Sequence, residues 1–206
     1  TCLVMVYASH TLVSESTWVH IEGPEASGYV NSRYLTEVGP ASEFCGNAEM
    51  DAVLELVRQS LANRDGAALA GLVHTERGLR LRHNWWNPEI LVPADDVADL
   101  FSDETVYEWG IADGSGLPIT GTFSEVMLPL LDKDLTAAQA SACDELLAGP
   151  TAGIVAVPEG YEAIPFASYF RASADVEFDW GTWVVGIERW GGHYYLSYLV
   201  HYAYEI

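Results

Sequence analysis

Basic side chains are scarce in this sequence. The 206 residues include one lysine, Lys133, and eight arginines against thirty acidic residues, for a formal charge of −21 at pH 7. Because nucleic-acid binding depends on neutralising phosphates with Lys and Arg, this composition excludes a nucleic-acid-binding protein. The same charge disfavours anionic membranes and would attract cations or basic peptides. A soluble acidic surface without a specific partner is the simpler interpretation.

Long apolar runs are missing as well. No stretch approaches the roughly 18–20 consecutive apolar residues that span a bilayer, and residues 1–6 lack the charged start and cleavage site of a signal peptide. Because the chain begins with Thr1 rather than Met, we expect a fragment or a mature form, which leaves an upstream signal or anchor open. Half of the residues are hydrophobic, so we expect a globular protein of one large or two ordinary domains.

Cysteine is rare, with three in the chain. Cys2, Cys45 and Cys143 show no C-x-x-C spacing, and no histidines stand at zinc-finger intervals, so neither a structural metal nor a cofactor is expected. Two arrangements remain open. Either Cys2 and Cys45 form a disulfide in an oxidising compartment and leave Cys143 free, or all three thiols are reduced and buried.

The strongest structural signal is a hairpin near the end of the chain. Residues 182–190 and 193–204 are rich in aromatic and β-branched side chains, and only Gly191-Gly192 separates them, which suits a two-residue primed turn. If Trp190 pairs with His193, one face is nearly all apolar and the other is mixed. The apolar face then holds Trp183, Val185, Ile187, Leu196, Tyr198 and Val200. The mixed face holds His201, which makes an outer surface as reasonable a place for it as a pocket.

Residues 1–38 predict short strands at 3–7, 18–22 and 28–30, joined by turns rich in Ser, Thr, Gly and Pro. The phrases Thr17-Trp18-Val19-His20-Ile21 and Gly28-Tyr29-Val30-Asn31-Ser32-Arg33-Tyr34-Leu35 resemble the second half of a bacterial SH3 domain. The first strand of that family and its Arg-Ser-Gly-Pro-like loop are missing, so the resemblance implies a partial SH3-like module over residues 1–39. It also implies an incomplete peptide-binding groove with three remaining aromatic residues, Trp18, Tyr29 and Tyr34. Ordinary barrel core is the alternative for these rings.

Beyond the linker at Gly39-Pro40, the pattern becomes helical and then β. Asn47 is placed to cap a helix that runs to about Asn63, with a buried stripe of Met50, Val53, Leu54, Val57 and Leu61. A short helix follows Asp65-Gly66, and alternation in residues 79–82 places Arg80 and Arg82 on one side of a strand. Further strands are expected at 72–74, 106–111, 154–157 and 162–172, a helical turn near 95–101, and helices at 123–131, with a Thr122 cap, and 134–147. We therefore predict an α+β domain in which helices cover one face of a curved antiparallel sheet.

Residues 47–206 also contain phrases that are similar to an uncharacterised family of secreted bacterial proteins and lipoproteins. The phrases are Leu72-Val73-His74 with Arg77-Gly78-Leu79, Glu108-Trp109-Gly110 with Asp113-Gly114-Ser115-Gly116 and Pro118-Ile119, Asp179-Trp180, and Leu199-Val200-His201. Tyr204-Glu205-Ile206 replaces the Trp-Thr-Ile-like ending of the family. Two opening helices and a terminal hairpin also look like the NTF2-like cone, which serves both enzymes and binding domains. The resemblance implies an extracytoplasmic or secreted location and no known activity.

Four residues are candidates for acid–base chemistry. His74 or His201 could pair with Asp113 or Asp179 in a cavity, as in an NTF2-like small-molecule hydrolase or isomerase. A histidine near a strand end is more often a hydrogen-bonded structural residue. The loop at Asp113-Gly114-Ser115-Gly116 lacks the later acidic ligands of a calcium site, and neither a G-x-S-x-G elbow nor a phosphate-binding glycine loop is present.

Aromatic side chains are the better guide to function. Core packing explains most of the tryptophans, and a few, Trp85 and Trp109 among them, are predicted to line a ligand cleft with Arg80 or Arg82. We therefore predict a non-catalytic extracytoplasmic or envelope-associated binding protein, whose ligand is a small molecule, a peptide or a cell-wall component. The alternatives are the hydrolase or isomerase and a structural oligomer subunit.

Overall fold

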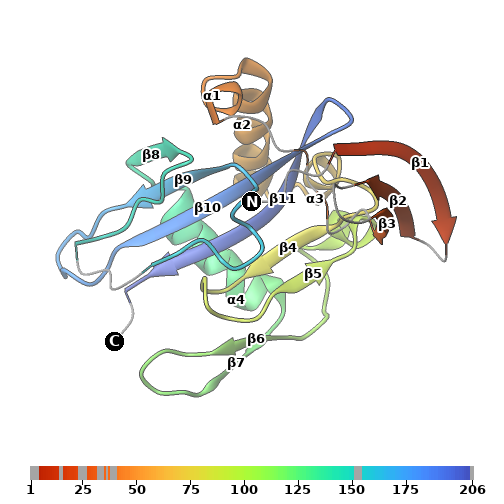
Figure 1. The fold of residues 1–206 in the computed structure, drawn as a ribbon. Helices are drawn as coiled ribbons and strands as arrows, with labels where there is room; N and C mark the ends of the chain where they lie inside the picture. Colours follow the sequence, from red (N-terminus) through yellow and green to blue (C-terminus); the bar gives the residue numbers. More distant parts are fainter. Residues whose placement is uncertain are drawn as a thin grey trace. The chain divides into compact units, whose positions relative to one another are not determined.

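The computed structural model describes residues 5–13, 16–22, 27–31, 35, 37, 41–150 and 155–204 (Figure 1). The chain splits into two compact units, Thr1–Glu37 and Val38–Ile206. Its architecture is mixed α+β, as the sequence predicts. No helix in the described part of the chain has the length and apolar character needed to cross a membrane.

The first unit contains a three-stranded antiparallel sheet of order β1-β2-β3. Its strands are β1 (Met5–Val13), β2 (Ser16–Glu22) and β3 (Ser27–Asn31). Val19 on β2 is buried, while Trp18 is half-buried and Tyr29 is exposed. The strands overlap the three predicted ones, and β1 is longer than expected. Tyr34 lies outside the described residues, and the SH3-like assignment stays a prediction.

The second unit is built on a six-stranded sheet of order β5-β4-β11-β10-β9-β8, in which β11 is parallel to β4 and every other pair is antiparallel (Figure 1). The strands are β4 (Leu79–Arg82), β5 (Ile90–Val92), β8 (Ala140–Cys143), β9 (Phe166–Arg171), β10 (Gly181–Trp190) and β11 (His193–Ala203). A separate two-stranded hairpin joins β6 (Tyr107–Ile111) to β7 (Pro118–Gly121). The predicted strand at residues 72–74 is reduced to a single bridge between Val73 and Leu196.

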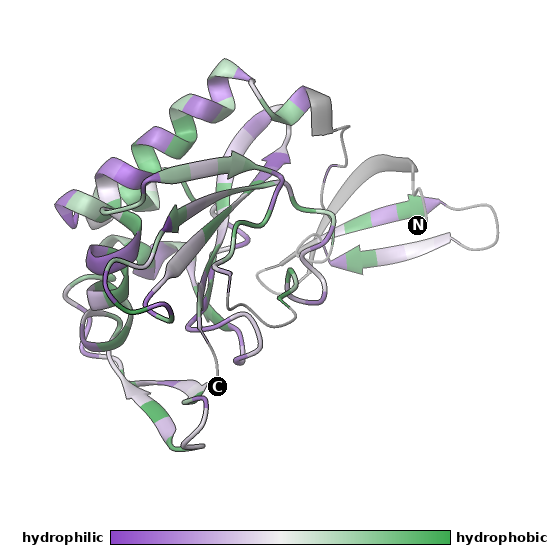
Figure 2. Ribbon diagram, turned by 90° about the vertical axis from the view of Figure 1, so that its left-hand side faces the viewer, coloured by the Kyte–Doolittle hydropathy of each residue, from purple (hydrophilic) through white to green (hydrophobic). Residues whose placement is uncertain are grey.

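Helices cover one face of this sheet. They are α1 (Ala41–Phe44), α2 (Ala48–Asn63), α3 (Gly66–Ala70) and α4 (Phe123–Leu130), with a 3₁₀ helix at Ala94–Asp99 and a π-helical turn at Leu131–Leu135. Asn47 caps α2 by accepting from the backbone N–H groups of Glu49 and Met50, and Thr122 caps α4, as predicted. Polar and apolar residues alternate along α2 (Figure 2), and its predicted stripe is buried at Met50, Leu54, Val57 and Leu61, with Val53 packed at its margin.

The predicted helix at residues 134–147 is wrong. The π-helical turn ends at Leu135, and residues 140–143 form β8 at the sheet edge instead. The Gln139 N–H donates to the carbonyl of Phe170 at 2.9 Å, which begins the pairing with β9. Strand pairing therefore outweighs the helix propensity of this Ala-rich segment, because propensity is a weak preference that tertiary contacts override.

The hairpin of β10 and β11 turns where the sequence predicts, with Trp190 opposite His193. A register shift between Gly186 and Ile187 then places one extra residue, Ser197, on β11. Past this bulge Trp183 lies opposite His201, so the predicted faces are wrong for the second half of the hairpin. Because side chains alternate along a strand, one added residue moves every later side chain of β11 to the other face.

Both faces of the sheet are covered, so the prediction of a single covered face is wrong. The helix-side core includes Trp183, Val185 and Leu199 with the stripe of α2. On the other face, which we call the outer face, a second core gathers around Tyr198, with the segment after β8 lying over it. This core consists of Tyr161, Ile164, Phe166, Trp180, Val184, Tyr198, Val200 and Tyr202.

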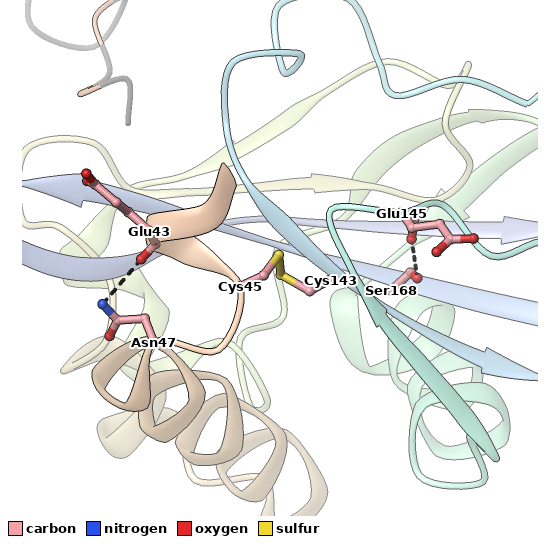
Figure 3. Close-up of a disulfide and its surroundings, with 6 residues drawn as sticks. All are labelled: Glu43, Cys45, Asn47, Cys143, Glu145 and Ser168. Carbon is pink, nitrogen blue, oxygen red and sulfur yellow. Dashed lines mark hydrogen bonds between the residues drawn. A yellow bond between two sulfur atoms is a disulfide. The ribbon is translucent and has the colours of Figure 1, made fainter. Parts of the chain in front are cut away.

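A disulfide joins Cys45 to Cys143, 98 residues apart in sequence (Figure 3). Both predicted arrangements of the cysteines are therefore wrong; Cys2 lies outside the described residues. The bond links the turn between α1 and α2 to β8. Hydrogen bonds hold the chain on each side, from Asn47 Nδ2 to the Glu43 carbonyl at 3.3 Å and from Ser168 Oγ to the Glu145 carbonyl at 2.6 Å (Figure 3). The sequence could not reveal this pairing, because it depends on β8 replacing the expected helix.

Candidate functional site: charged clusters on the two faces of the sheet

The helix-side face holds a buried network centred on Asp134, in the π-helical turn. His201 Nε2 lies 2.7 Å from Asp134 Oδ2, and Arg171 Nε donates to Asp134 Oδ1 at 2.6 Å. The carboxylate lies directly over Gly181 of β10, where an added Cβ would come within 2.3 Å of the Asp134 Cγ. Only a residue without a side chain leaves space for the carboxylate at this position.

The network continues to the surface through Asp179. Arg171 Nη1 donates to the Asp179 carbonyl at 2.6 Å, and Lys133 Nζ donates to Asp179 Oδ1 at the same distance. The hydrogen bond from Lys133 lowers the pKa of the Asp179 carboxyl. Burial raises the pKa of the Asp134 carboxyl, but hydrogen bonds and opposite charges from His201 and Arg171 outweigh burial and lower it overall.

This network has a structural role. Both oxygens of Asp134 are already bonded, and the side chains of Asp134 and His201 are 2% and 4% exposed, so a substrate has no access to either. The network ties β9 and β11 to the π-helical turn. Breaking such a buried pair by removing one partner destabilises a protein strongly, because the other charge stays buried and unpaired.

A second charged group lies on the outer face, and we call it the outer arginine cluster: Arg77, Arg80, Arg82 and Glu188. Arg77 Nη1 donates to Glu188 Oε1 at 2.6 Å, and Arg80 Nη2 lies 3.5 Å from the same oxygen. Arg80 and Arg82 point to this face because Leu79 and Leu81, which alternate with them along β4, point into the helix-side core. The prediction that the two arginines share one side of the strand is confirmed.

Aromatic rings stack on the guanidinium groups of this cluster. Arg77 lies 4.4 Å from the centre of the Trp190 ring, while Arg80 and Arg82 lie 4.9 and 5.3 Å from that of Tyr161. The Tyr161 hydroxyl donates to Glu89 Oε2 at 2.5 Å. Such cation–π contacts stabilise an arginine that is partly removed from water. Each arginine of the outer arginine cluster thus contacts one aromatic ring.

Three half-exposed rings stand at the turn end of this face, and we call them the aromatic rim: His74, Trp190 and Tyr195. The His74 ring lies 4.9 Å from Tyr195 and 6.3 Å from Trp190, edge to face in both pairs. Its Nδ1 accepts from the backbone N–H of Glu76. Burial and the neighbouring Arg77 lower the pKa of His74, so its imidazole is neutral at pH 7.

The four candidate acid–base residues do not form one site. His201 and Asp179 belong to the same network but are separated by Asp134 and Arg171. His74 touches Tyr195, six residues before His201 on β11, a separation of about 20 Å along a strand. Asp113 is exposed in the turn between β6 and β7. No arrangement of these residues brings a histidine and a carboxylate together at an accessible place.

The candidate ligand-binding residues are also divided. Trp109 is fully buried in the helix-side core, where its Nε1 donates to the Gly121 carbonyl at 2.9 Å. Trp85 is half-buried against the outer core. Trp18 and Tyr29 belong to the first unit, where Tyr29 contacts His20, and Tyr34 lies outside the described residues. Arg80 and Arg82 alone meet partners of the expected kind.

Sequence reasoning missed Arg77, Glu188 and Tyr161. One signal was present for Glu188, a carboxylate that directly follows the apolar run 183–187 of its strand, because a buried charge requires a cationic partner. The partner is far away in sequence, so no local pattern identifies it. Among the described residues, no group of three or more His, Cys, Asp or Glu side chains is placed to hold a metal ion.

Comparison with protein-family models, with curated proteins and with solved structures found no match.

Proposed function

We propose that the protein is a non-catalytic, extracytoplasmic binding protein whose ligand contacts the aromatic rim. The observation that carries this proposal is the half-exposed His74, Trp190 and Tyr195 beside the outer arginine cluster. Flat rings next to fixed charged donors are typical of ligand sites, where the rings supply contact area and a few polar groups supply orientation. The ligand class is a small molecule, a peptide or a cell-wall component.

The Cys45–Cys143 disulfide supports the extracytoplasmic part of the proposal, because structural disulfides persist in oxidising compartments. The finer fold assignment is also part of it. Residues 1–39 form a partial bacterial SH3-like module, and residues 47–206 form an NTF2-like domain. The helices α2 and α3 before the sheet and the closing hairpin of β10 and β11 support the second assignment.

Glycan and peptide arrays followed by calorimetry test the proposal. For any ligand found, Trp190→Ala is expected to weaken binding about tenfold or more, because a ring at the centre of a contact contributes at least 1.4 kcal/mol. Phe178→Ala is the matched control, since Phe178 is an exposed ring that contacts Tyr204 instead. Equal binding by the wild type and Trp190→Ala, or turnover of the bound ligand, would overturn the proposal.

A further inference from the structure

Arg80 keeps part of its hydrogen-bonding capacity unused. Within the described residues, its contacts to oxygen, with Ser197 Oγ and Glu188 Oε1, are both made through Nη2. Arginine carries five N–H donors in a fixed planar fork, and among the described residues the Nε and Nη1 donors of Arg80 have no acceptor. The side chain is 17% exposed. Its unpaired Nε and Nη1 atoms do not belong to the fully buried atoms without a partner, so solvent reaches both of them. Arg80 is therefore a cation that a ligand can reach.

The outer arginine cluster has more positive than negative charge. Arg77 and Arg80 share the single carboxylate of Glu188, and Arg77 takes the shorter contact, 2.6 Å against 3.5 Å. Arg82 donates to the Asn87 carbonyl rather than to a carboxylate. Holding arginines this close costs free energy unless a further anion accompanies them. With Glu89, which accepts from the Tyr161 hydroxyl beside Arg80 and Arg82, three guanidinium groups lie near two carboxylates, a local positive balance in a chain with a net charge of −21.

A buried donor lies in the same layer. Tyr198 pairs with Arg80 across the parallel strands and packs against Tyr161, with ring centres 4.4 Å apart. Its hydroxyl is buried and, among the described residues, has no hydrogen-bond partner. Burial and the neighbouring Tyr202 and Tyr161 hold the pKa of this hydroxyl well above its usual value, so it stays a neutral donor. Buried donors without a partner are rare, and water or a ligand can supply the acceptor that the described residues do not.

We infer that the ligand of the outer face is a small ring-shaped carboxylate, whose carboxylate pairs with Arg80 and whose ring packs on the aromatic rim. This inference rests on the proposed function and names its ligand class. Arg–carboxylate pairs are bidentate and about twice as strong as neutral hydrogen bonds. The strong negative charge of the whole chain repels polyanions, so a single carboxylate is favoured over a polyphosphate.

The experiment compares matched acids and neutral analogues. Benzoate with benzyl alcohol and galacturonate with galactose are titrated into the full chain at pH 7 by calorimetry, with inorganic phosphate as a further anion. At least one acid is expected to bind about tenfold more tightly than its neutral analogue, and added salt is expected to weaken it. The benzoate and galacturonate arms distinguish an aromatic acid from a sugar acid. Equal binding of acid and neutral partner, binding by phosphate alone, or no binding by either acid overturns the inference.

Variants identify the residue responsible. Arg80→Gln is expected to abolish the preference for the acid, whereas Arg189→Gln, an exposed arginine on the same hairpin, leaves it unchanged. Arg80→Lys keeps the charge but loses the fork, so about a tenfold loss is expected. If Arg80→Gln lowers the unfolding temperature, its loss of binding could come from misfolding, and Arg80→Lys then serves as the test.

The two proposals fail in different ways. A neutral ligand that is weakened by Trp190→Ala and unaffected by Arg80→Gln leaves the aromatic rim as the binding surface and overturns the carboxylate. Insensitivity of every ligand to Trp190→Ala removes the proposed function.

Discussion

His83 connects a single side chain to the pH dependence of folding. It is partly buried, its ring lies 6.5 Å from that of His201, and burial together with His201 lowers its pKa to about 4 from 6.5. As the pH falls below 6.5, His83 becomes protonated in the unfolded chain but stays neutral in the folded chain. The free energy of unfolding should therefore fall between pH 6.5 and 4, by up to about 3 kcal/mol from this group.

Urea denaturation of the wild type and of His83→Gln across this pH range measures the effect. The variant should lose less stability on acidification, while His193→Gln, which changes an exposed histidine at the hairpin turn, should follow the wild type. The lowered pKa values of Asp134 and Asp179 act below about pH 4, outside this range, whereas the lowered pKa of His74 acts within it and does so in the wild type and the variant alike. Parallel curves for the wild type and His83→Gln would contradict the assignment.

At the scale of elements, the disulfide between the α1–α2 turn and β8 should contribute strongly to stability. In the chain-entropy description, a bond that closes a loop of about 100 residues is worth about 4–5 kcal/mol, and this bond spans 98. Cys143→Ser is expected to lower the unfolding temperature in calorimetric scans. A reductant should lower the unfolding temperature of the wild type but not that of Cys143→Ser. If Cys2→Ser, the control, shows the same loss, the assigned pairing is wrong.

Local patterns predicted the elements whose causes are local. The Asn47 cap, the buried stripe of α2, the Thr122 capping box and the turn at Gly191-Gly192 each depend on residues within a few positions of one another. They are confirmed for that reason. The alternation of Arg80 and Arg82 along β4 is confirmed on the same grounds.

Features set by distant partners were predicted wrongly or missed. The bulge at Ser197 moves His201 to the helix side, where it meets Asp134, and nothing in the hairpin sequence marks it. Residues 140–143 become a strand because β9 is available beside them. The outer arginine cluster depends on Glu188, which lies 111 residues from Arg77. The bulge, the strand and the outer arginine cluster each depend on contacts between distant residues, so only the tertiary structure reveals them.

At the scale of the whole molecule, the second unit should fold without the first. It has its own helix-side core and outer core, and its disulfide lies wholly within it. Residues 41–206 produced alone are expected to unfold in one cooperative transition and to keep the ligand preference assigned to Arg80. Far-UV circular dichroism during heating, with the intact chain as reference, checks this. A non-cooperative transition would show that the first unit is required.

The position of β11 has a consequence for the synthesis of the protein. This strand is the last of the six in sequence, yet it lies in the middle of the sheet, between β4 and β10. Until the ribosome has released residues up to about Tyr202, β4 and β5 are separated from β8, β9 and β10, and two sheet edges remain open. Domains usually fold as units during translation. Here the nascent chain must wait for nearly its whole second unit, so two sheet edges stay open to pairing with other chains until translation of this unit is almost complete.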